Sequence, residues 1–175
     1  MIRLLAAAVL PLAALSACAT PSSPLAAREG EGTLRDANGA IKGTAALVRT
    51  GDVLSLAIAV RGLPAGAHGI HLHTAGKCDG PDFASSGGHL NPDGHQHGTL
   101  NPAGHHLGDL PNLTVDANGL GALTVPLSGS AGDLETMLFD SDGTALVIHA
   151  GADDYKTDPS GNSGGRIACA VLART

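Results

Sequence analysis

The sequence predicts an all-β fold, a sandwich or barrel with two long loops. Short apolar or alternating runs recur along the chain, and turn-forming residues separate them, with 25 Gly and 10 Pro among 175 residues. Residues 74–109 and 151–165 are rich in small and polar residues and show no sustained apolar periodicity. About eight short strands joined by Gly-rich turns are typical of sandwiches and barrels, and irregular segments this long usually carry function.

The first residues indicate an export signal. Met1–Arg3 is a short basic start, and Leu4–Leu15 is an apolar run too short to span a membrane as a helix. The Leu-Ser-Ala-Cys segment that ends at Cys18 resembles a bacterial lipobox, which implies removal of residues 1–17 and lipidation of Cys18. An ordinary signal peptide with an incidental Cys18 is the alternative.

The lipoprotein interpretation also predicts how the rest of the chain is organised. Residues 18–29 are expected to form a lipidated N-terminus and a flexible tether, and residues 30–175 one folded domain. Diacylglycerol together with an N-acyl chain is enough for stable membrane attachment. The expected location is therefore the bacterial periplasm or cell envelope, with the membrane reached only through the lipid at Cys18.

The first half of the domain contains four strand candidates. Asp36-Ala37-Asn38-Gly39 predicts a hairpin turn, because Asn-Gly tolerates the positive φ angles of a tight turn. Val53–Arg61 alternates large apolar residues with small ones, as a half-buried strand does. The predicted strands are Gly30–Arg35, Ile41–Thr50, Val53–Arg61 and Ala67–His73.

The second half repeats this pattern after the first long loop. Asp116-Ala117-Asn118-Gly119 has the same four residues as the first turn and predicts a second hairpin. Leu134–Phe139 predicts a helical turn. The remaining predicted strands are Leu113–Val115, Leu120–Pro126, Ala145–Ala150 and Arg166–Leu172.

The composition limits the possible core, partners and cross-links. Trp is absent and Phe occurs twice, so the core must be built from Val, Leu, Ile and Ala. The formal net charge is −6 and no basic cluster occurs, which argues against a nucleic-acid-binding surface. Apart from Cys18, two cysteines remain, Cys78 and Cys169. In an exported protein they are expected to pair, which would contribute about 4–5 kcal/mol, and two free thiols or two metal ligands are the alternatives.

Seven of the nine histidines lie between Ile70 and Asp109. Alternate side chains of a strand share a face, so His71 and His73 are expected to point the same way while Leu72 points into the core. Two imidazoles on one strand face can bind one metal ion. His149, at the end of another apolar strand, could complete this set.

A second candidate group follows within the same segment. His97, His106 and Asp109 offer two imidazoles and a carboxylate, a ligand set that suits structural zinc. His89 is the natural fourth ligand, and it would bridge two metals if each of its ring nitrogens bound one. The other histidines are expected to be solvated or satisfied by hydrogen bonds: His68, which has the opposite strand parity, and His95 and His105.

Four segments of the chain resemble motifs of the copper/zinc superoxide dismutases. They occur in the family order, and the resemblance covers about residues 30–173. The predicted architecture is an eight-stranded Greek-key β-sandwich or barrel with two long functional loops. The four segments are Gly69–His73 (GIHLH), Gly87–Pro92 (GGHLNP), His106–Asn112 (HLGDLPN) and Gly161–Cys169 (GNSGGRIAC).

The resemblance implies one copper and one zinc per chain. It places copper on His71, His73, His89 and His149, and zinc on His89, His97, His106 and Asp109. It also implies a Cys78–Cys169 disulfide and an outer aspartate, Asp153, that links copper and zinc histidines. The catalytic residues it implies are His89, which would carry a proton, and Arg166, which would guide and hold an anion beside copper.

The activity implied by the resemblance is dismutation of superoxide to O₂ and H₂O₂, by a redox-cycling copper with a structural zinc. It would protect the cell envelope from extracytoplasmic superoxide. A non-catalytic copper- and zinc-binding or buffering module of the same fold is the alternative, and Arg166 discriminates the two, because a metal store needs no anion-holding cation. Superoxide is the expected partner, Lys77 and Lys156 are expected to help steer it, and the chain is expected to be a monomer or a homodimer.

Overall fold

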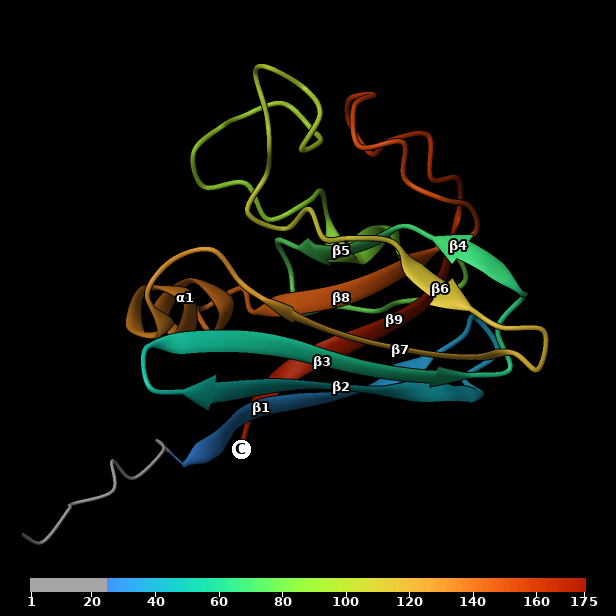
Figure 1. The fold of residues 1–175 in the computed structure, drawn as a ribbon. Helices are drawn as coiled ribbons and strands as arrows, with labels where there is room; N and C mark the ends of the chain where they lie inside the picture. The colour runs from blue at the N-terminus through green and yellow to red at the C-terminus, as the bar shows by residue number, and fades with distance from the viewer. Residues whose placement is uncertain (1–24) are drawn as a thin grey trace, which may run out of the picture.

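The computed structural model describes residues 25–175, and the predicted signal sequence and Cys18 lie outside this range. Antiparallel strands curl into a barrel-like sandwich, and the two long loops project from one end of it (Figure 1). The described helical elements are η1 (Ala84–Ser86) and α1 (Ala131–Leu138), and neither is long and apolar enough to cross a membrane. The strands are β1 (Ala26–Arg35), β2 (Ile41–Thr50), β3 (Val53–Arg61), β4 (Gly66–His68), β5 (Ile70–His73), β6 (Leu113–Val115), β7 (Leu120–Pro126), β8 (Thr144–His149) and β9 (Arg166–Arg174).

The larger sheet brings the two ends of the chain together. Its strand order is β5-β8-β9-β1-β2-β3-β7, and every pair in it is antiparallel. The C-terminal strand β9 therefore lies between β8 and β1, and β8 lies beside β5. A second, two-stranded sheet consists of β4 and β6. The predicted all-β fold is confirmed, and the strand order places the strand that ends at His149 next to the strand that carries His71 and His73.

The predicted strand Ala67–His73 is two strands, because the chain changes partner at Gly69. The residues before Gly69 pair with β6, and those after it pair with β8. The Gly69 N–H donates to the carbonyl of Gly151 at 2.8 Å, so this point also contacts the second long loop. A Cβ atom at residue 69 would lie 2.8 Å from the Cβ of Ser163, which leaves room only for glycine.

Three predicted elements extend further than the sequence indicated. Strand β1 starts at Ala26 rather than Gly30, because its first residues pair with the end of β2, so the last part of the predicted tether lies in the sheet. Strand β9 continues to Arg174, paired with β1. Helix α1 starts after Ser130, whose side chain accepts a hydrogen bond from the N–H of Asp133, a typical helix N-cap.

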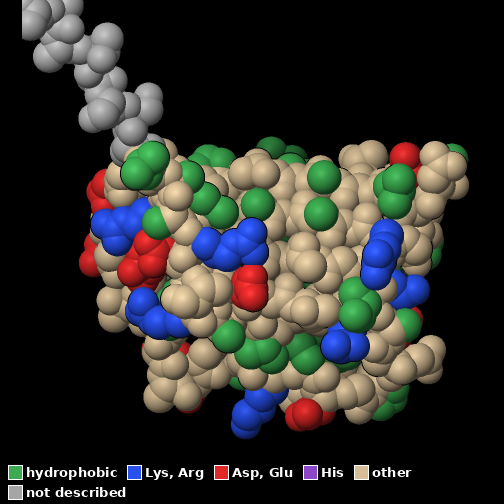
Figure 2. Space-filling view, turned by 90° about the horizontal axis from the view of Figure 1, so that it is seen from below, with side chains coloured by type: hydrophobic (Ala, Val, Ile, Leu, Met, Phe, Trp, Pro, Cys, Tyr) green, Lys and Arg blue, Asp and Glu red, His purple; other side chains and the backbone are tan. Residues whose placement is uncertain are grey.

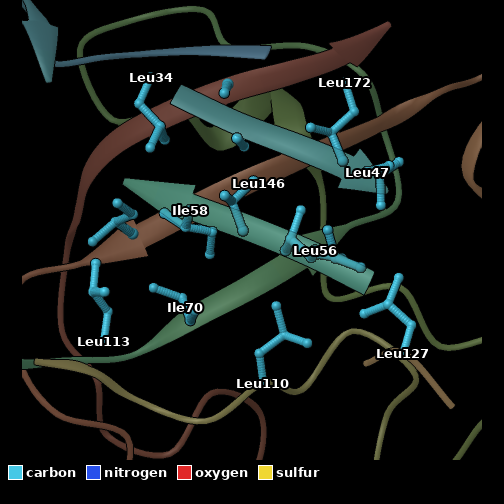
Figure 3. Packing of buried hydrophobic residues seen from close by; sticks show 14 of the residues in the cluster. Leu34, Leu47, Leu56, Ile58, Ile70, Leu110, Leu113, Leu127, Leu146 and Leu172 are labelled. Atoms are coloured by element: carbon cyan, nitrogen blue, oxygen red, sulfur yellow. The ribbon is translucent and has the colours of Figure 1, made fainter. Parts of the chain in front are cut away.

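Aliphatic side chains fill the interior between the strands (Figure 3). They come from opposite parts of the barrel, and full burial of each such side chain contributes about 1.5–3 kcal/mol. This is the Val, Leu, Ile and Ala core that the composition predicted. The largest members of the cluster with no exposed surface include Leu34, Leu47, Leu54, Leu56, Ile70, Leu113, Leu134, Leu138, Leu146 and Ile148.

The face of the barrel that lies away from the loops has a different character. Acidic and basic side chains are mixed on it, and no histidine is visible among the described residues of this face (Figure 2). The histidine-bearing segments instead gather at the loop end of the barrel (Figure 1). The β-sandwich therefore serves as a scaffold, and the histidine-bearing segments are concentrated at one end of it.

Candidate metal centre

Strand pairing brings together the histidines of β5 and β8. Val147 of β8 is the register partner of His71, and Ala145 that of His73, while the N–H of His149 donates to the Gly69 carbonyl at 2.8 Å. The ring centroids of His71 and His149 are 4.8 Å apart, and all three histidines are buried. Because strand pairing fixes the backbone of each of these residues, the sheet itself sets the spacing of their rings.

Each of these three histidines has one ring nitrogen fixed by a hydrogen bond. The Nδ1–H groups of His73 and His149 donate to the carbonyls of Gly87 and Gly164, both at 2.9 Å. His71 Nε2 lies 2.8 Å from the Asp153 carboxylate. The other nitrogens, His71 Nδ1, His73 Nε2 and His149 Nε2, are buried and have no hydrogen-bond partner among the described residues.

These free nitrogens converge with a fourth histidine. Ligand atoms of His71, His73, His89 and His149 all lie within 4.8 Å of one another. Buried polar atoms without partners are costly, so a cluster of them indicates a ligand that satisfies them. Imidazole nitrogen is a preferred ligand of copper, and four of them in one buried group fit a copper ion. We call this group the copper half of the site.

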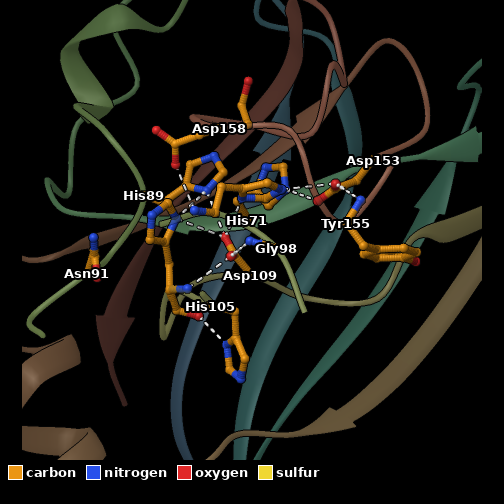
Figure 4. Close-up of polar contacts among 12 residues, drawn as sticks. His71, His89, Asn91, Gly98, His105, Asp109, Asp153, Tyr155 and Asp158 are labelled. Carbon is orange, nitrogen blue, oxygen red and sulfur yellow. Dashed lines mark hydrogen bonds and ion pairs between the residues drawn. The ribbon is translucent and has the colours of Figure 1, made fainter. Parts of the chain in front are cut away.

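The loop residues form a second group around Asp109. Its Oδ1 lies 2.9 Å from His89 Nδ1, 2.9 Å from His97 Nδ1 and 3.2 Å from His106 Nδ1. The Nδ1 atoms of His89 and His106 are 3.3 Å apart. Ligands of a tetrahedral zinc ion at its usual bond lengths lie about 3.3 Å from one another, so this spacing fits zinc. We call these four residues the zinc half, and Figure 4 shows His89 and Asp109 in contact.

His71 also lies close to the zinc half. Its ligand atom is within 4.8 Å of those of His89, His97 and Asp109. Its Nε2 already contacts Asp153, however, which leaves Nδ1 as its single available nitrogen, and that atom belongs to the copper half. His106, whose Nδ1 touches both Asp109 and His89, is the better fourth member of the zinc half.

His89 belongs to both halves through its two ring nitrogens. Its Nδ1 contacts Asp109, and its ring stacks on that of His71 with a centroid distance of 3.9 Å. A histidine in this position can bind one ion through each nitrogen. Spacing along the chain left this bridge open, because it does not show where the two ring nitrogens point, and only the family resemblance implied that His89 binds both ions.

Asp153 joins the two halves from the outside. One carboxylate oxygen contacts His71 Nε2 at 2.8 Å, and the other contacts His97 Nε2 at 3.0 Å (Figure 4). Asn112 holds the Asp153 backbone in place, because its amide donates to the Asp153 carbonyl and accepts from the Asp153 N–H, both at 2.9 Å. Outer partners of this kind fix the tautomer and orientation of metal-binding histidines.

Two residues of this outer network were missed by the sequence reasoning. Asn112 stands inside the HLGDLPN segment, so its presence in that motif was the available signal. Tyr155 had no such signal. Its N–H donates to Asp153 Oδ1 at 2.6 Å and its hydroxyl accepts from the Asn112 N–H at 2.7 Å, so it ties the second loop to the first.

Burial controls the protonation of the centre. It lowers the pKa of His71 to about 4 and that of His73 to about 2, and it also lowers the pKa of His89 and His149. Burial alone would raise the pKa of Asp109, but contacts with His89 and with two backbone N–H groups lower it below its ordinary range. Near neutral pH these four imidazoles are therefore neutral and the Asp109 carboxylate is ionised, the forms that bind metals.

A cavity of about 470 Å³ opens onto the copper half, and Arg166 lines it together with His73, His89 and His149. The Arg166 guanidinium donates to the carbonyls of Phe83 (2.7 Å) and Gly87 (2.8 Å) and to the hydroxyl of Ser86 (2.9 Å). These contacts hold its positive charge at the edge of the cavity. A small anion that entered the cavity would meet this charge beside the histidines.

The predicted disulfide between Cys78 and Cys169 is confirmed. It links the first long loop to β9, three residues beyond Arg166. The Gly87 carbonyl of the same loop accepts hydrogen bonds from both His73 and Arg166. The disulfide therefore fastens the loop segment that positions the copper half.

The remaining histidines and the two predicted steering lysines lie outside the centre. The ring nitrogens of His68, which is buried, lie 2.7 Å from the His149 carbonyl and 2.9 Å from the Pro64 carbonyl. It is the satisfied core histidine that the sequence predicted. His95 is exposed and His105 half-buried, and Lys77 and Lys156 are both exposed.

Comparisons with known proteins agree with this geometry. The family description "Copper/zinc superoxide dismutase (SODC)" matches residues 41–172. "Superoxide dismutase [Cu-Zn] 2" of Aquifex aeolicus is 43% identical over 142 residues, covering 79% of this chain and 83% of that protein. The crystal structure of a SOD-like protein from Bacillus subtilis has a TM-score of 0.77 and 39% identity, covering 84% of this chain and 100% of that one. The structure of the Cu/Zn superoxide dismutase from Brucella abortus has a TM-score of 0.64 and 27% identity, covering 82% of this chain and 99% of that one. The chain belongs to the copper/zinc superoxide dismutase family.

Proposed function

We propose that this chain is a superoxide dismutase that uses copper and zinc to convert two superoxide anions and two protons into O₂ and H₂O₂. The observation that carries the proposal is the set of buried nitrogens of His71, His73 and His149 beside the Arg166 cavity, which have no hydrogen-bond partner within residues 25–175. Family membership supports it, since relatives from three bacteria, Aquifex aeolicus, Deinococcus radiodurans and Caulobacter vibrioides, bear this enzyme name. We propose copper on His71, His73, His89 and His149, and zinc on His89, His97, His106 and Asp109.

Each ion has a distinct contribution. Copper held by His71, His73, His89 and His149 would supply one-electron redox chemistry, and zinc held by His89, His97, His106 and Asp109 would tie these loop residues together without redox chemistry. Arg166 binds the anionic substrate at the cavity edge and holds it near the copper half. His89 faces the same cavity and can hold a proton on the nitrogen that does not face Asp109, so it is placed to deliver that proton to the reduced substrate.

The remaining residues keep these groups in place. Asp109 and Asp153 hold the rings of His89, His97 and His71 in defined orientations. The Gly87 and Gly164 carbonyls do the same for His73 and His149. Burial lowers the pKa of His71, His73, His89 and His149, so no protonation of these four rings competes with metal binding near neutral pH.

The test combines metal analysis with an assay for superoxide removal. We expect one copper and one zinc per chain, with activity lost when copper is removed and zinc retained. Full occupancy of both ions without dismutation above that of the buffer would contradict the proposal. It would favour the alternative of a non-catalytic metal-binding module, and one relative is named only "superoxide dismutase-like".

We also propose that the chain is an exported lipoprotein of the cell envelope. The Leu-Ser-Ala-Cys segment at Cys18 supports lipidation, and the Cys78–Cys169 disulfide supports an oxidising compartment such as the periplasm. The folded domain begins at β1, which leaves residues 18–25 as the link to the lipid. Labelling cells with a fatty-acid analogue should mark the wild-type protein and not Cys18→Ser, whereas equal labelling would contradict the anchor.

The extracytoplasmic role and the assembly are part of the same proposal. We propose that the substrate is superoxide formed outside the cytoplasm, and that the chain acts as a monomer or a homodimer. Cell fractionation with a periplasmic marker tests the location. Sedimentation of the purified, metal-loaded protein tests the assembly, and a species larger than a dimer would contradict it.

A further inference from the structure

Tyr155 is half-buried and connects Asp153 to two distant parts of the chain. Its N–H donates to Asp153 Oδ1 at 2.6 Å (Figure 4). Its carbonyl accepts from the N–H of Leu100 at 2.8 Å, and its hydroxyl accepts from the N–H of Asn112 at 2.7 Å. All three polar groups of this one residue are therefore used to fix the second long loop against residues 100 and 112.

The backbone of Tyr155 has an uncommon conformation. Its φ angle is +61°, in the left-handed region that residues with a Cβ atom seldom adopt, and such a conformation persists where the surrounding contacts determine it. The Tyr155 carbonyl also packs against Gly98, where a Cβ atom would collide with its oxygen. The Gly98 N–H donates to the Asp109 carboxylate at 2.8 Å, so Tyr155 also lies against the backbone that holds the zinc half.

We propose that Tyr155 is a positioning residue, which acts through Asp153 to hold one histidine ring in each half of the metal centre. The Asp153 oxygen that accepts from the Tyr155 N–H also contacts His97 Nε2 at 3.0 Å, and the other oxygen contacts His71 Nε2 at 2.8 Å. A shift of Tyr155 would therefore move a ring of the zinc half and a ring of the copper half together. This inference rests on the copper and zinc ligands proposed above.

The hydroxyl of Tyr155 allows a mild test, because Tyr155→Phe removes it and keeps the ring. The N–H of Asn112 then loses its acceptor, and Asn112 is the residue whose side chain holds the Asp153 backbone through two hydrogen bonds of 2.9 Å. One neutral hydrogen bond changes an equilibrium constant by about two- to twelvefold. We expect a loss of metal affinity in this range, smaller than the about 10–100-fold loss when a direct outer partner such as Asp153 is removed.

The experiment measures the copper and zinc affinities of the full chain by competition with chelators. Tyr155→Phe should weaken the binding of both ions by about two- to twelvefold. In the Asp153→Ala background the same substitution should have no further effect, because the carboxylate through which it acts is absent. The control Thr124→Val removes an exposed hydroxyl on β7 and should leave both affinities unchanged. Wild-type affinities in Tyr155→Phe, or an equal loss in both backgrounds, would overturn the inference.

A second measurement needs no metal. Tyr155 is the only tyrosine and the chain has no Trp, so the intrinsic fluorescence of the metal-free protein comes from this position. Asp153→Ala removes the acceptor of the Tyr155 N–H, and acrylamide should therefore quench this fluorescence more strongly than in the wild type, in samples that circular dichroism shows to be folded. Equal quenching would overturn the link between the two residues. If Asp153→Ala does not fold, the affinities of Tyr155→Phe alone decide the test.

The outcomes separate this inference from the proposed function. A wild-type chain that binds neither copper nor zinc would contradict both. A wild-type chain that binds both ions and removes superoxide, with affinities that do not change in Tyr155→Phe, would contradict the role of Tyr155 alone. A lower unfolding midpoint of metal-free Tyr155→Phe with unchanged metal affinities would show a purely structural role, and would also overturn the inference.

Discussion

The copper half and the zinc half each place several imidazoles in one buried region, but different interactions position the rings in the two halves. In the copper half, β5 and β8 carry three histidines, and backbone carbonyls or Asp153 fix their outer nitrogens. Their inner nitrogens have no partner among the described residues. In the zinc half, loop residues surround one carboxylate, Asp109, which contacts three rings at once.

The difference shows which interactions position the histidine rings in each half. The copper half depends on sheet register and keeps three buried nitrogens that only a ligand can satisfy. The zinc half depends on a charge, since Asp109 also accepts the N–H groups of Gly98 (2.8 Å) and His106 (3.0 Å) through its second oxygen. Removing the charge should therefore disrupt the zinc half, whereas disturbing the sheet or its attached loop should affect the copper half first.

The largest expected effect is that of Asp109→Asn. The substitution keeps the size of the side chain but removes the charge that three rings and two N–H groups share. Breaking such a buried network costs about 3–5 kcal/mol of unfolding free energy. We also expect zinc affinity to fall by more than about 100-fold, beyond the loss caused by removing an outer partner. Urea unfolding and zinc competition measure the two effects, with Asp142→Asn as control. Loss of copper with zinc binding intact would contradict the division into halves.

Removal of the disulfide should act mainly on the copper half. In Cys78→Ser/Cys169→Ser, the loop that carries Gly87 loses its link to β9, and the unfolding free energy should fall by about 2–5 kcal/mol. Because the Gly87 carbonyl holds both His73 and Arg166, copper affinity should fall more than zinc affinity. Competition with chelators for each ion compares the two. Cys18→Ser is the matched control, since it removes a cysteine and leaves the disulfide. Equal losses for both ions would show that the loop supports the halves alike.

Acid should affect the halves of the metal-free protein in sequence. The folded pKa of His71 (about 4) lies below its ordinary value of 6.5, so its contribution is present above pH 6.5 and is lost as pH falls toward 4. The loss is up to about 1.4 kcal/mol per pH unit for each such histidine. The pKa values of Asp109 and Asp153 are lowered from 3.8, so their contribution is lost only below about pH 4. Urea midpoints of the metal-free protein between pH 3 and pH 8 should therefore begin to fall near pH 6.5. A midpoint that stays constant down to pH 4 would contradict this order.

Arg166→Ala should have the smallest effect on folding and a selective effect on activity. The side chain is not a member of either ligand group, so both ions should remain bound. Loss of a positive charge at the cavity should lower the rate constant for superoxide by about tenfold and flatten its dependence on ionic strength. Pulse-radiolysis kinetics at several salt concentrations measure this. Arg166→Lys keeps the charge but not the fork that contacts Phe83, Ser86 and Gly87, and should retain most of the salt dependence. Unchanged kinetics in Arg166→Ala would remove this residue from substrate binding.

Much of the fold and of the site was predictable, because it depends on patterns of residues that lie close together in the sequence. Most strands lie where alternation and turn residues predicted them, and all the predicted ligand residues lie within the two halves. The prediction was wrong where one strand changes partner at Gly69 and where β1 begins at Ala26. Both errors have the same cause, since the partner strand that decides these boundaries is distant in the sequence.

The sequence by itself determined the features whose partners lie a few residues apart. The two Asp-Ala-Asn-Gly turns are the clearest case: the N–H of Asn38 donates to Asp36 Oδ1 at 2.9 Å, and the N–H of Asn118 donates to Asp116 Oδ1 at 2.8 Å. Identical residues give identical turns, because a side chain that reaches its own backbone needs no tertiary partner.

Only the tertiary structure decided how the two long loops meet. Asp153 contacts His71 across 82 positions of the chain and His97 across 56, and the two faces of His89 are assigned only once the sheet has placed its neighbours. Sequence motifs named these residues, but hydrogen bonds over such separations depend on strand register and loop attachment. The tetrads therefore exist only in the folded chain, where β5, β8 and β9 bring the two ends of the sequence to one end of the barrel.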